Sequence, residues 1–310
     1  MQEVSGKKEK RTMSDRRHPP PPVVKRRILC YIFIMIVRAV QFSPTLGDIA
    51  RNMEFHLDAI SRAVRDRIDL IVFPELSLSG YHLKDIVYDI ALTIDSPEIL
   101  KFRNSSRKID VVLGAPIEEP SGIIYNCALY FSRGKLQHRH RKVQLPNYGM
   151  FEERMIFKEG DCFDSFGIGP LTAGMLICRE ILFPVHAYLY FLQKTDFLIG
   201  ISASPFRGIS EDGFSSFELW ESMGNLYSQF YHQNYLFVNR VGFEDGIGFG
   251  GGSFFARAGV GIVQKAKYFA DDVLDAEIRL EDVRRARIST NYYRDEQPPM
   301  ILKEMQRILK

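Results

Sequence analysis

Three reactive side chains, Glu75, Lys142 and Cys178, each stand at the end of a segment that reads as a buried strand. Glu75 follows residues 71–74, Lys142 ends the segment that starts at Lys135, and Cys178 follows residues 175–177. The ends of strands in α/β sheets are where ligands bind and where reactive side chains are held rigidly. A thiolate can attack a carbonyl carbon, a carboxylate can take the thiol proton, and an ammonium can stabilise the oxyanion. The combination is therefore suited to covalent attack on a carbonyl group.

Taken singly, each of these residues has a structural explanation. Glu75 could cap the loop that contains Ser77, Ser79 and Gly80, and Lys142 is one of several cations in residues 138–142. A buried cysteine is more often an inert small hydrophobic residue than a nucleophile. The three residues together, at three strand ends, favour the functional interpretation.

Strands and helices alternate along the chain from residue 35 onward. Met53, Leu57, Ile60 and Val64 form one apolar stripe, which predicts a helix. Strands are predicted to end near residue 41 and to cover 70–73, 110–114, 123–131, 135–142, 173–177, 197–201 and 235–238, with further helices at 184–194 and 214–233. Nearly all-apolar strands indicate sheets that are covered on both faces, and hairpins at 123–142 and 251–270 argue against a purely parallel sheet. We therefore predict an α/β fold made of two sheets flanked by helices.

The sequences around the three reactive residues resemble the signatures of the nitrilase, or carbon–nitrogen hydrolase, superfamily. These are Phe-Pro-Glu-Leu-Ser-Leu-Ser-Gly-Tyr at 73–81, Arg-Lys-Val-Gln-Leu-Pro at 141–146, and Leu-Ile-Cys-Arg-Glu with Phe-Pro at 176–184. The similarity extends from about Ile36 to Ile278. The resemblance implies a four-layer α-β-β-α sandwich in which Cys178 forms a thioester, Glu75 acts as general base and acid, and Lys142 stabilises the oxyanion.

Within the superfamily, the chain is most similar to the glutaminase domain of glutamine-dependent NAD synthetases. The similar stretches are residues 145–154, 203–206, 238–242 and 251–254. The resemblance implies that Glu153 is a second glutamate that orients the site, and that Tyr148 and Ser204 contact the substrate. No SGGxDS ATP-binding loop occurs in the sequence, so we expect that the chain does not make NAD alone.

Arg179 departs from the glutaminase pattern directly after the nucleophile. Those domains commonly have an acidic residue at this position, which is suited to holding the ammonium of glutamine. An arginine there should weaken binding of an α-ammonium and favour a carboxylate or a neutral group. We therefore expect Arg179 to contribute to substrate binding and expect a small linear amide as substrate, and whether glutamine is accepted stays open.

Two further motifs have a structural interpretation. Residues 246–251 satisfy the pattern GxGxxG, but an extended pattern and not a helix follows them, so we predict a glycine-rich hairpin. His138 and His140 lack a nearby carboxylate or cysteine in the sequence and are interpreted as one exposed face of a strand. We therefore predict no metal site and no organic cofactor.

The charge and cysteine content limit the classes of partner. The 41 basic and 38 acidic residues are interspersed and give a net charge of only +3, which argues against a nucleic-acid partner and for a small-molecule substrate. Four cysteines without a CxxC pair indicate neither a zinc site nor a disulfide framework. A cytoplasmic location is expected.

The first 34 residues are predicted to form a disordered extension, and residues 35–310 to form one domain. The extension is basic and contains four consecutive prolines at residues 19–22. Basic residues 25–27 and the apolar run after them imitate a signal peptide, but that run is too short for a membrane span and continues into the first predicted strand. We therefore expect no membrane partner.

These observations predict an amide-cleaving enzyme that releases ammonia from a small linear amide. The resemblance also implies a homodimer or a larger homo-oligomer that pairs through the α-layer and the C-terminal segment. Two alternatives remain open: a glutaminase subunit that supplies ammonia to a separate synthetase-type partner, and a catalytically silent scaffold with the same fold.

Overall fold

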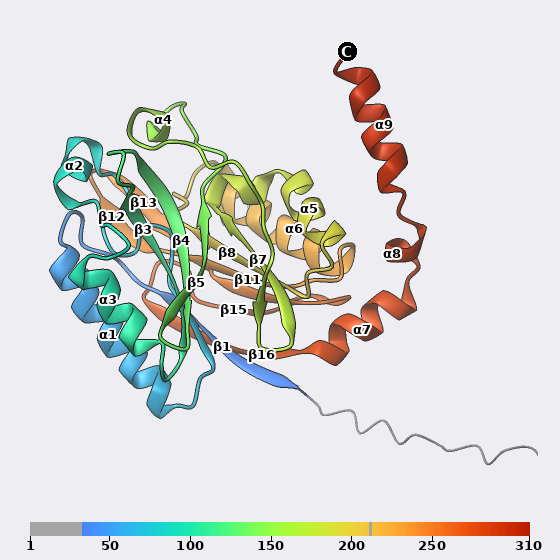
Figure 1. Cartoon of the computed structure of the whole chain (residues 1–310), viewed down its shortest axis with the longest axis horizontal. Helices are drawn as coiled ribbons and strands as arrows, with labels where there is room; N and C mark the ends of the chain where they lie inside the picture. The colour runs from blue at the N-terminus through green and yellow to red at the C-terminus, as the bar shows by residue number, and fades with distance from the viewer. Residues whose placement is uncertain (1–32, 211–212) are drawn as a thin grey trace, which may run out of the picture. The chain divides into compact units, whose positions relative to one another are not determined.

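The computed structural model describes residues 33–210 and 213–310, which contain two six-stranded sheets packed face to face (Figure 1). The first sheet has the order β16 (Asp272–Arg279), β1 (Ile34–Gln41), β2 (Leu70–Val72), β3 (Asp110–Glu118), β4 (Ile124–Ser132) and β5 (Lys135–Arg141). The second has the order β15 (Gly261–Lys265), β14 (Phe254–Arg257), β11 (Asn234–Asn239), β8 (Phe197–Ser202), β7 (Leu171–Ile177) and β6 (Phe166–Ile168). Both sheets mix parallel and antiparallel pairs, as predicted.

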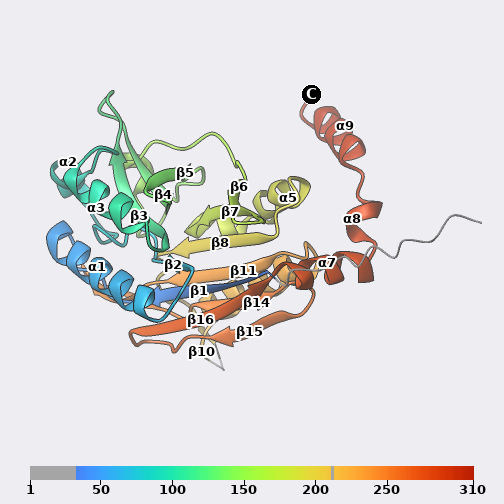
Figure 2. The same ribbon diagram turned by 60° about the horizontal axis from the view of Figure 1, so that its bottom comes forward.

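Helices cover the outer face of each sheet, which completes the predicted α-β-β-α layering (Figure 2). α1 (Ile49–Arg65) and α3 (Pro97–Ser105) pack on the first sheet, and α5 (Pro184–Leu192) and α6 (Ser215–Gln229) pack on the second. The shorter elements are η1 (Lys84–Ile86), α2 (Val87–Ile90), α4 (Glu153–Ile156), η2 (Cys178–Leu182), β9 (Ile209–Ser210), β10 (Gly213–Phe214), β12 (Val241–Glu244), β13 (Ile247–Gly250), α7 (Leu280–Ser289), α8 (Tyr292–Asp295) and α9 (Pro298–Ile308).

The central strands β2, β3 and β4 of the first sheet are largely apolar because each contributes to two cores. In β2, Leu70 and Val72 face the core between the sheets, while Ile71 and the following Phe73 face the core beneath α1 and α3. The same alternation divides β4, where Ala128 packs between the sheets and Leu129 packs under the helices. Because side chains alternate along a strand, a sheet buried on both faces produces the continuous apolar runs of the sequence.

Most predicted elements are confirmed, with shifted boundaries. The helix predicted from Met53 to Val64 is α1, and residues 246–251 lie at the turn and second strand of the β12–β13 hairpin, as predicted. The strand predicted at 110–114 continues to Glu118 in β3, through Pro116. β3 pairs with β2 only as far as Val112, so Pro116 lies beyond the end of that neighbour and its missing N–H costs no bond on that side.

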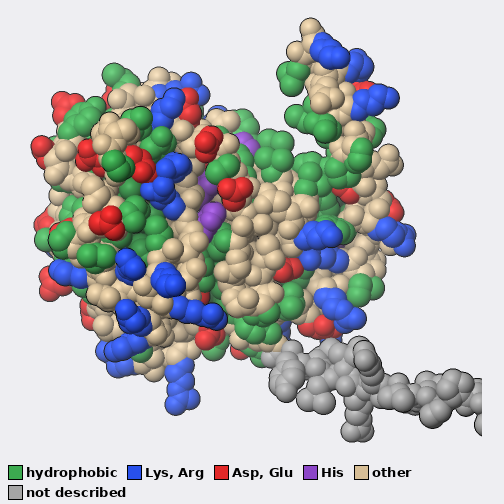
Figure 3. Space-filling view, in the orientation of Figure 1, with side chains coloured by type: hydrophobic (Ala, Val, Ile, Leu, Met, Phe, Trp, Pro, Cys, Tyr) green, Lys and Arg blue, Asp and Glu red, His purple; other side chains and the backbone are tan. Residues whose placement is uncertain are grey.

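The chain enters the sandwich through β1, which begins at Ile34. The predicted extension of residues 1–34 lies outside the described residues except for Phe33 and Ile34. In the described part of the chain, every helix is too short or too polar to cross a lipid bilayer. On the face shown in Figure 3, Lys and Arg side chains lie among Asp and Glu over much of the surface and gather toward its lower edge.

Gly114 positions the loop that follows β2. A β-carbon at this glycine would lie 2.8 Å from the Cα of Glu75 and 2.7 Å from the backbone oxygen of Pro74. The carbonyl of Gly114 accepts a hydrogen bond of 3.2 Å from the backbone N–H of Leu78. The absence of a side chain at Gly114 therefore allows the backbone of residues 74–78 to cross β3 in direct contact with it.

We predict that Gly114→Ala lowers the free energy of unfolding by about 1–3 kcal/mol, because the added methyl group collides with backbone and not with a movable side chain. Urea unfolding measures the change. Gly167→Ala in β6 is the matched control, since a β-carbon there meets nothing within 4 Å. Equal stability of the two variants would contradict the proposed close approach.

Candidate active site

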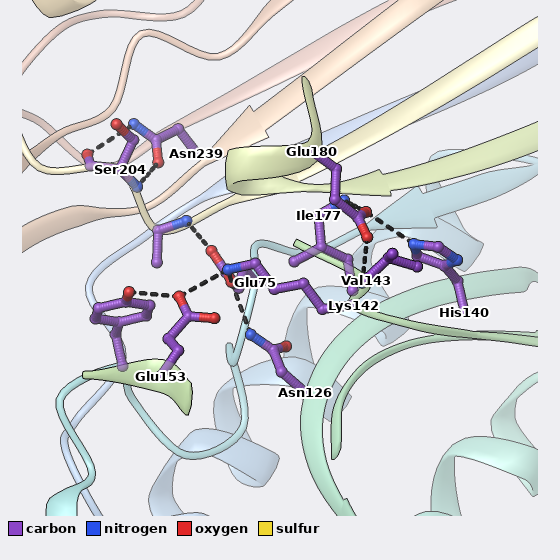
Figure 4. A network of polar contacts seen from close by, with 12 residues as sticks. Glu75, Asn126, His140, Lys142, Val143, Glu153, Ile177, Glu180, Ser204 and Asn239 are labelled. Atoms are coloured by element: carbon purple, nitrogen blue, oxygen red, sulfur yellow. Dashed lines mark hydrogen bonds and ion pairs between the residues drawn. The ribbon is translucent and has the colours of Figure 1, made fainter. Parts of the chain in front are cut away.

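The side chains of Glu75, Lys142 and Glu153 meet in a fully buried ionic cluster (Figure 4). Lys142 Nζ lies 2.6 Å from Glu75 Oε1 and 2.7 Å from Glu153 Oε1. Glu75 follows β2 and Lys142 follows β5, both in the first sheet, and Glu153 begins α4. An ammonium has three N–H donors, so these two contacts leave one N–H of Lys142 for another acceptor.

Glu75 is held in one orientation by hydrogen bonds to both carboxylate oxygens. Asn126 Nδ2 donates to Oε1 over 2.8 Å, and the backbone N–H of Ala203 donates to Oε2 over 2.8 Å. Asn126 lies on β4 in the first sheet, whereas Ala203 directly follows β8 in the second. The carboxylate of Glu75 therefore spans the junction between the two sheets.

Cys178 directly follows β7 in the second sheet and has a left-handed backbone conformation, with φ of 47°. A non-glycine residue in this region is strained, and such strain is concentrated at functional sites. Burial, followed by the negative charge of Glu75, raises the pKa of the Cys178 thiol to about 12, although Lys142 opposes the shift. The thiol is thus protonated at neutral pH and needs a base before it can attack.

The charges of the cluster depend on burial and on one another. Burial raises the pKa of Glu153 to about 7, against the opposing effect of Lys142. Burial alone would lower the pKa of Lys142, but Glu153 and Glu75 outweigh it and raise that pKa, so the ammonium stays charged. Tyr81 donates from its hydroxyl to Glu153 Oε1 over 2.6 Å. The result is a permanent cation held between two carboxyl groups, and burial opposes the charged form of Glu153.

Two of the predicted substrate-binding residues, Tyr148 and Arg179, lie in contact. Arg179 Nη1 donates to the Tyr148 hydroxyl over 2.9 Å, and its guanidinium carbon lies 5.1 Å and 5.3 Å from the ring centres of Tyr148 and Phe183. A cavity of about 310 Å³ is lined by these three residues together with residues 144–147 and Arg154. The aromatic contacts hold the guanidinium of Arg179 at the wall of this cavity.

Ser204, the third predicted substrate-binding residue, is buried and bonded elsewhere. Its hydroxyl accepts a hydrogen bond of 2.9 Å from Trp220 Nε1, and its backbone N–H donates to Asn239 Oδ1 over 2.9 Å. It follows Ala203, the backbone donor to Glu75. In the described structure, its hydrogen bonds support the loop after β8 and join it to no other predicted site residue.

The prediction that His138 and His140 form an exposed strand face is wrong. His140 is buried, and its Nε2 lies 2.8 Å from Glu180 Oε2, a carboxylate 40 residues further along the chain. The His138 ring stacks on Phe166, 4.4 Å away, at the start of β6. The alternating side chains of β5, an edge strand, suggested that one face of the strand is exposed to solvent. The segment around β6 covers that face.

Asn126 and Tyr81 were not predicted as site residues. Asn126 is the polar residue within the apolar sequence of β4, and a buried amide requires a hydrogen-bond partner, which is a usable signal. Tyr81 ends the glutamate signature, but nothing in that motif shows that its hydroxyl reaches Glu153, 72 residues away.

Comparison with known proteins identifies the family. Residues 36–288 match the family model for carbon-nitrogen hydrolases. The glutamine-dependent NAD(+) synthetase of Thermotoga maritima is 29% identical over 253 residues, which cover 79% of this chain and 42% of that protein. This chain therefore spans less than half the length of that curated relative.

Solved structures support the same assignment. The structure of a glutamine-dependent NAD+ synthetase from Acinetobacter baumannii matches with a TM-score of 0.71 and 26% identity, covering 79% of this chain and 45% of that one. A carbon-nitrogen hydrolase from Helicobacter pylori, 21% identical, matches the fold with a TM-score of 0.74 over 85% of this chain and 95% of its own. The predicted sandwich is thus confirmed, and the chain belongs to the carbon-nitrogen hydrolase family.

Proposed function

We propose that this chain hydrolyses the carbon–nitrogen bond of a small linear amide and releases ammonia through a thioester on Cys178. The observation that carries the proposal is the buried ammonium of Lys142, which forms an ion pair with Glu75. The same ammonium lowers the pKa of the thiol of Cys178, a residue with a left-handed backbone conformation. A protonated thiol, a carboxylate and a cation with one unused N–H are the groups that amide attack requires.

The reaction follows from the positions of these groups. Glu75 takes the thiol proton as sulfur bonds to the carbonyl carbon, and the free N–H of Lys142 and the backbone N–H after Cys178 stabilise the oxyanion. The carbon–nitrogen bond then breaks while Glu75 returns the proton to the departing nitrogen, which leaves as ammonia. Water attacks the thioester, its proton passes to Glu75, and the carbon–sulfur bond breaks to give a carboxylic acid and the free thiol. Glu153 and Tyr81 hold Lys142 in place.

A preference for an anionic substrate is supported by the cavity that Tyr148 and Arg179 line. Two guanidinium groups, those of Arg154 and Arg179, line it, and no Asp or Glu is among the described residues that do so. In the described structure neither arginine has a carboxylate within ion-pair distance. A cavity with two cations and no anion attracts a carboxylate and repels an α-ammonium. We therefore propose an ω-amide of a dicarboxylic acid, bound by Arg179 and Tyr148.

A second candidate is a glutaminase that supplies ammonia to a separate synthetase. It is supported by the similarity to glutamine-dependent NAD synthetases, of which this chain spans less than half. Arg179 opposes it, because glutamine carries an α-ammonium. This candidate predicts little activity by the chain alone and stimulation by a synthetase partner, whereas a silent scaffold predicts no turnover in either case.

We predict that wild-type protein releases ammonia from at least one member of a panel of ω-amides, glutamine, N-carbamoyl amino acids and nitriles, and that Cys178→Ala releases none. Glu75→Gln should lower kcat by at least about 10²-fold, because the thiol then lacks its base. The control is Cys162→Ala, which removes an exposed thiol. Equal turnover by Cys178→Ala and wild type would exclude the thioester mechanism.

We predict that Arg179→Glu shifts the ratio of kcat/KM for glutamine to that for a carboxylate-bearing ω-amide by about tenfold or more toward glutamine. A carboxylate in this position attracts the α-ammonium and repels the anion; tenfold corresponds to about 1.4 kcal/mol. Arg284→Glu, on the exposed face of α7, is the charge-matched control. An unchanged ratio of kcat/KM values would show that Arg179 does not determine which substrate is preferred.

We also propose a homodimer that pairs through the α-layer and the C-terminal segment. No residue of α9 is buried, although Leu302, Met305 and Ile308 are apolar and recur at helical spacing. Val185 and Leu189 on α5 are exposed as well. Apolar side chains at helical spacing that remain exposed favour a partner surface.

Light scattering of the wild type is expected to give twice the chain mass. The double variant Met305→Asp with Ile308→Asp should give the mass of one chain, while Lys303→Asp, on the opposite face of α9, should leave the mass unchanged. A single-chain mass for the wild type at micromolar concentration would refute this pairing.

A further inference from the structure

Glu180 lies two residues after Cys178, and its carboxylate accepts hydrogen bonds from the backbone on both sides of the site (Figure 4). The N–H of Ile177 donates to Oε2 over 2.7 Å, and the N–H of Val143 donates to Oε1 over 2.6 Å. Ile177 directly precedes Cys178, and Val143 directly follows Lys142. One side chain therefore joins the peptide next to the nucleophile to the peptide next to the ammonium.

This connection crosses the junction between the two sheets. Ile177 ends β7 of the second sheet, while Val143 follows β5, the edge strand of the first. In the described structure, no strand of one sheet pairs with a strand of the other, so their relative position depends on side-chain packing and on such bridges. The separation of Cys178 and Lys142 is thus determined in part by the length of a single glutamate side chain.

His140 holds the Glu180 carboxylate in this position. Its Nε2 lies 2.8 Å from Oε2, the oxygen that also binds Ile177. Burial would raise the pKa of Glu180, but His140 and the two backbone N–H groups outweigh burial and lower it, so the group is an anion. An anionic carboxylate only accepts hydrogen bonds, which requires that Nε2 of His140 carries a proton.

The other groups near Glu180 are compatible with this role. His186 Nδ1 lies 3.0 Å from the backbone oxygen of Glu180, not from its carboxylate. Tyr190 donates its hydroxyl to the backbone oxygen of Met175 over 2.8 Å. Both oxygens of the Glu180 carboxylate are thus used by Ile177, Val143 and His140, and none of its contacts is to a residue of the reaction.

We propose that Glu180, oriented by His140, is a positioning residue that sets the separation between the Cys178 thiol and the Lys142 ammonium. It transfers no proton and acts only through the two peptides it joins. The consequence for amide turnover rests on the proposed function, but the effect on the thiol does not.

The variants follow from the hydrogen-bond pattern. Glu180→Gln keeps the length of the side chain but replaces one acceptor by an –NH₂ group, which must face an N–H donor of Ile177, Val143 or His140. That donor–donor contact pushes one strand end away. His140→Leu removes the N–H that orients the carboxylate, whereas His140→Gln retains an N–H donor at a similar distance.

The control variant is Asp196→Asn, because Asp196 bonds to Thr172 at the opposite end of β7 from Ile177. Asp196 is also a buried carboxylate that accepts a backbone N–H, from Thr172 over 3.0 Å, and an arginine, Arg287, over 2.9 Å. Its loss should destabilise the fold by a comparable mechanism without moving the strand ends that carry Cys178 and Lys142. Urea unfolding of each variant then measures the purely structural contribution.

The test is the rate at which iodoacetamide alkylates Cys178 as a function of pH, with kcat and KM measured on the best amide. Lys142 lowers the pKa of the thiol, so moving it away should shift the alkylation profile to higher pH. We expect this shift in Glu180→Gln and His140→Leu, near-wild-type behaviour in His140→Gln, and no shift in Asp196→Asn. In the two shifted variants kcat should fall between about 10- and 100-fold with little change in KM.

The outcomes separate this proposal from the proposed function. A shifted alkylation profile without turnover of any amide by the wild type would support the positioning role and reject the hydrolase. Wild-type alkylation and kcat in folded Glu180→Gln would overturn the positioning role. If Glu180→Gln does not fold, the pair His140→Leu and His140→Gln decides, and identical profiles in that pair would overturn it as well.

Discussion

The buried ammonium of Lys142 is the constraint on which the site depends. Removing an ammonium from water is costly unless anions and hydrogen bonds replace the hydration shell, and Glu75 and Glu153 supply both. Each carboxylate in turn needs donors of its own, which Asn126, Ala203 and Tyr81 provide. One buried charge thus determines the positions of five other groups from separate parts of the chain.

The two-sheet architecture explains why the site lies where it does. Glu75 and Lys142 follow strands of the first sheet, while Cys178 follows a strand of the second. Glu75 reaches across to the backbone of Ala203, and Glu180 reaches across in the other direction to the backbone of Val143. The reactive groups therefore belong to different sheets, and two carboxylates hold the sheets in register around them.

Much of this arrangement could be predicted from the sequence, because its signals are local. Apolar runs and a helical stripe predicted most strands and helices, and the motifs around Glu75, Lys142 and Cys178 predicted that they act together. The roles of His140 and Glu180 could not be predicted, since alternation along β5 shows which residues share a face but not what covers that face. The contact of Tyr81 with Glu153 depends likewise on the path of a loop, which no local pattern encodes.

The division of β2 between two cores has a consequence for how this chain can evolve. Only three residues form the strand, and Glu75 follows it after two more. Because consecutive side chains point to opposite faces, inserting or deleting one residue within β2 would exchange the side chains that face the two cores. The length of β2 should therefore tolerate no single-residue change during descent.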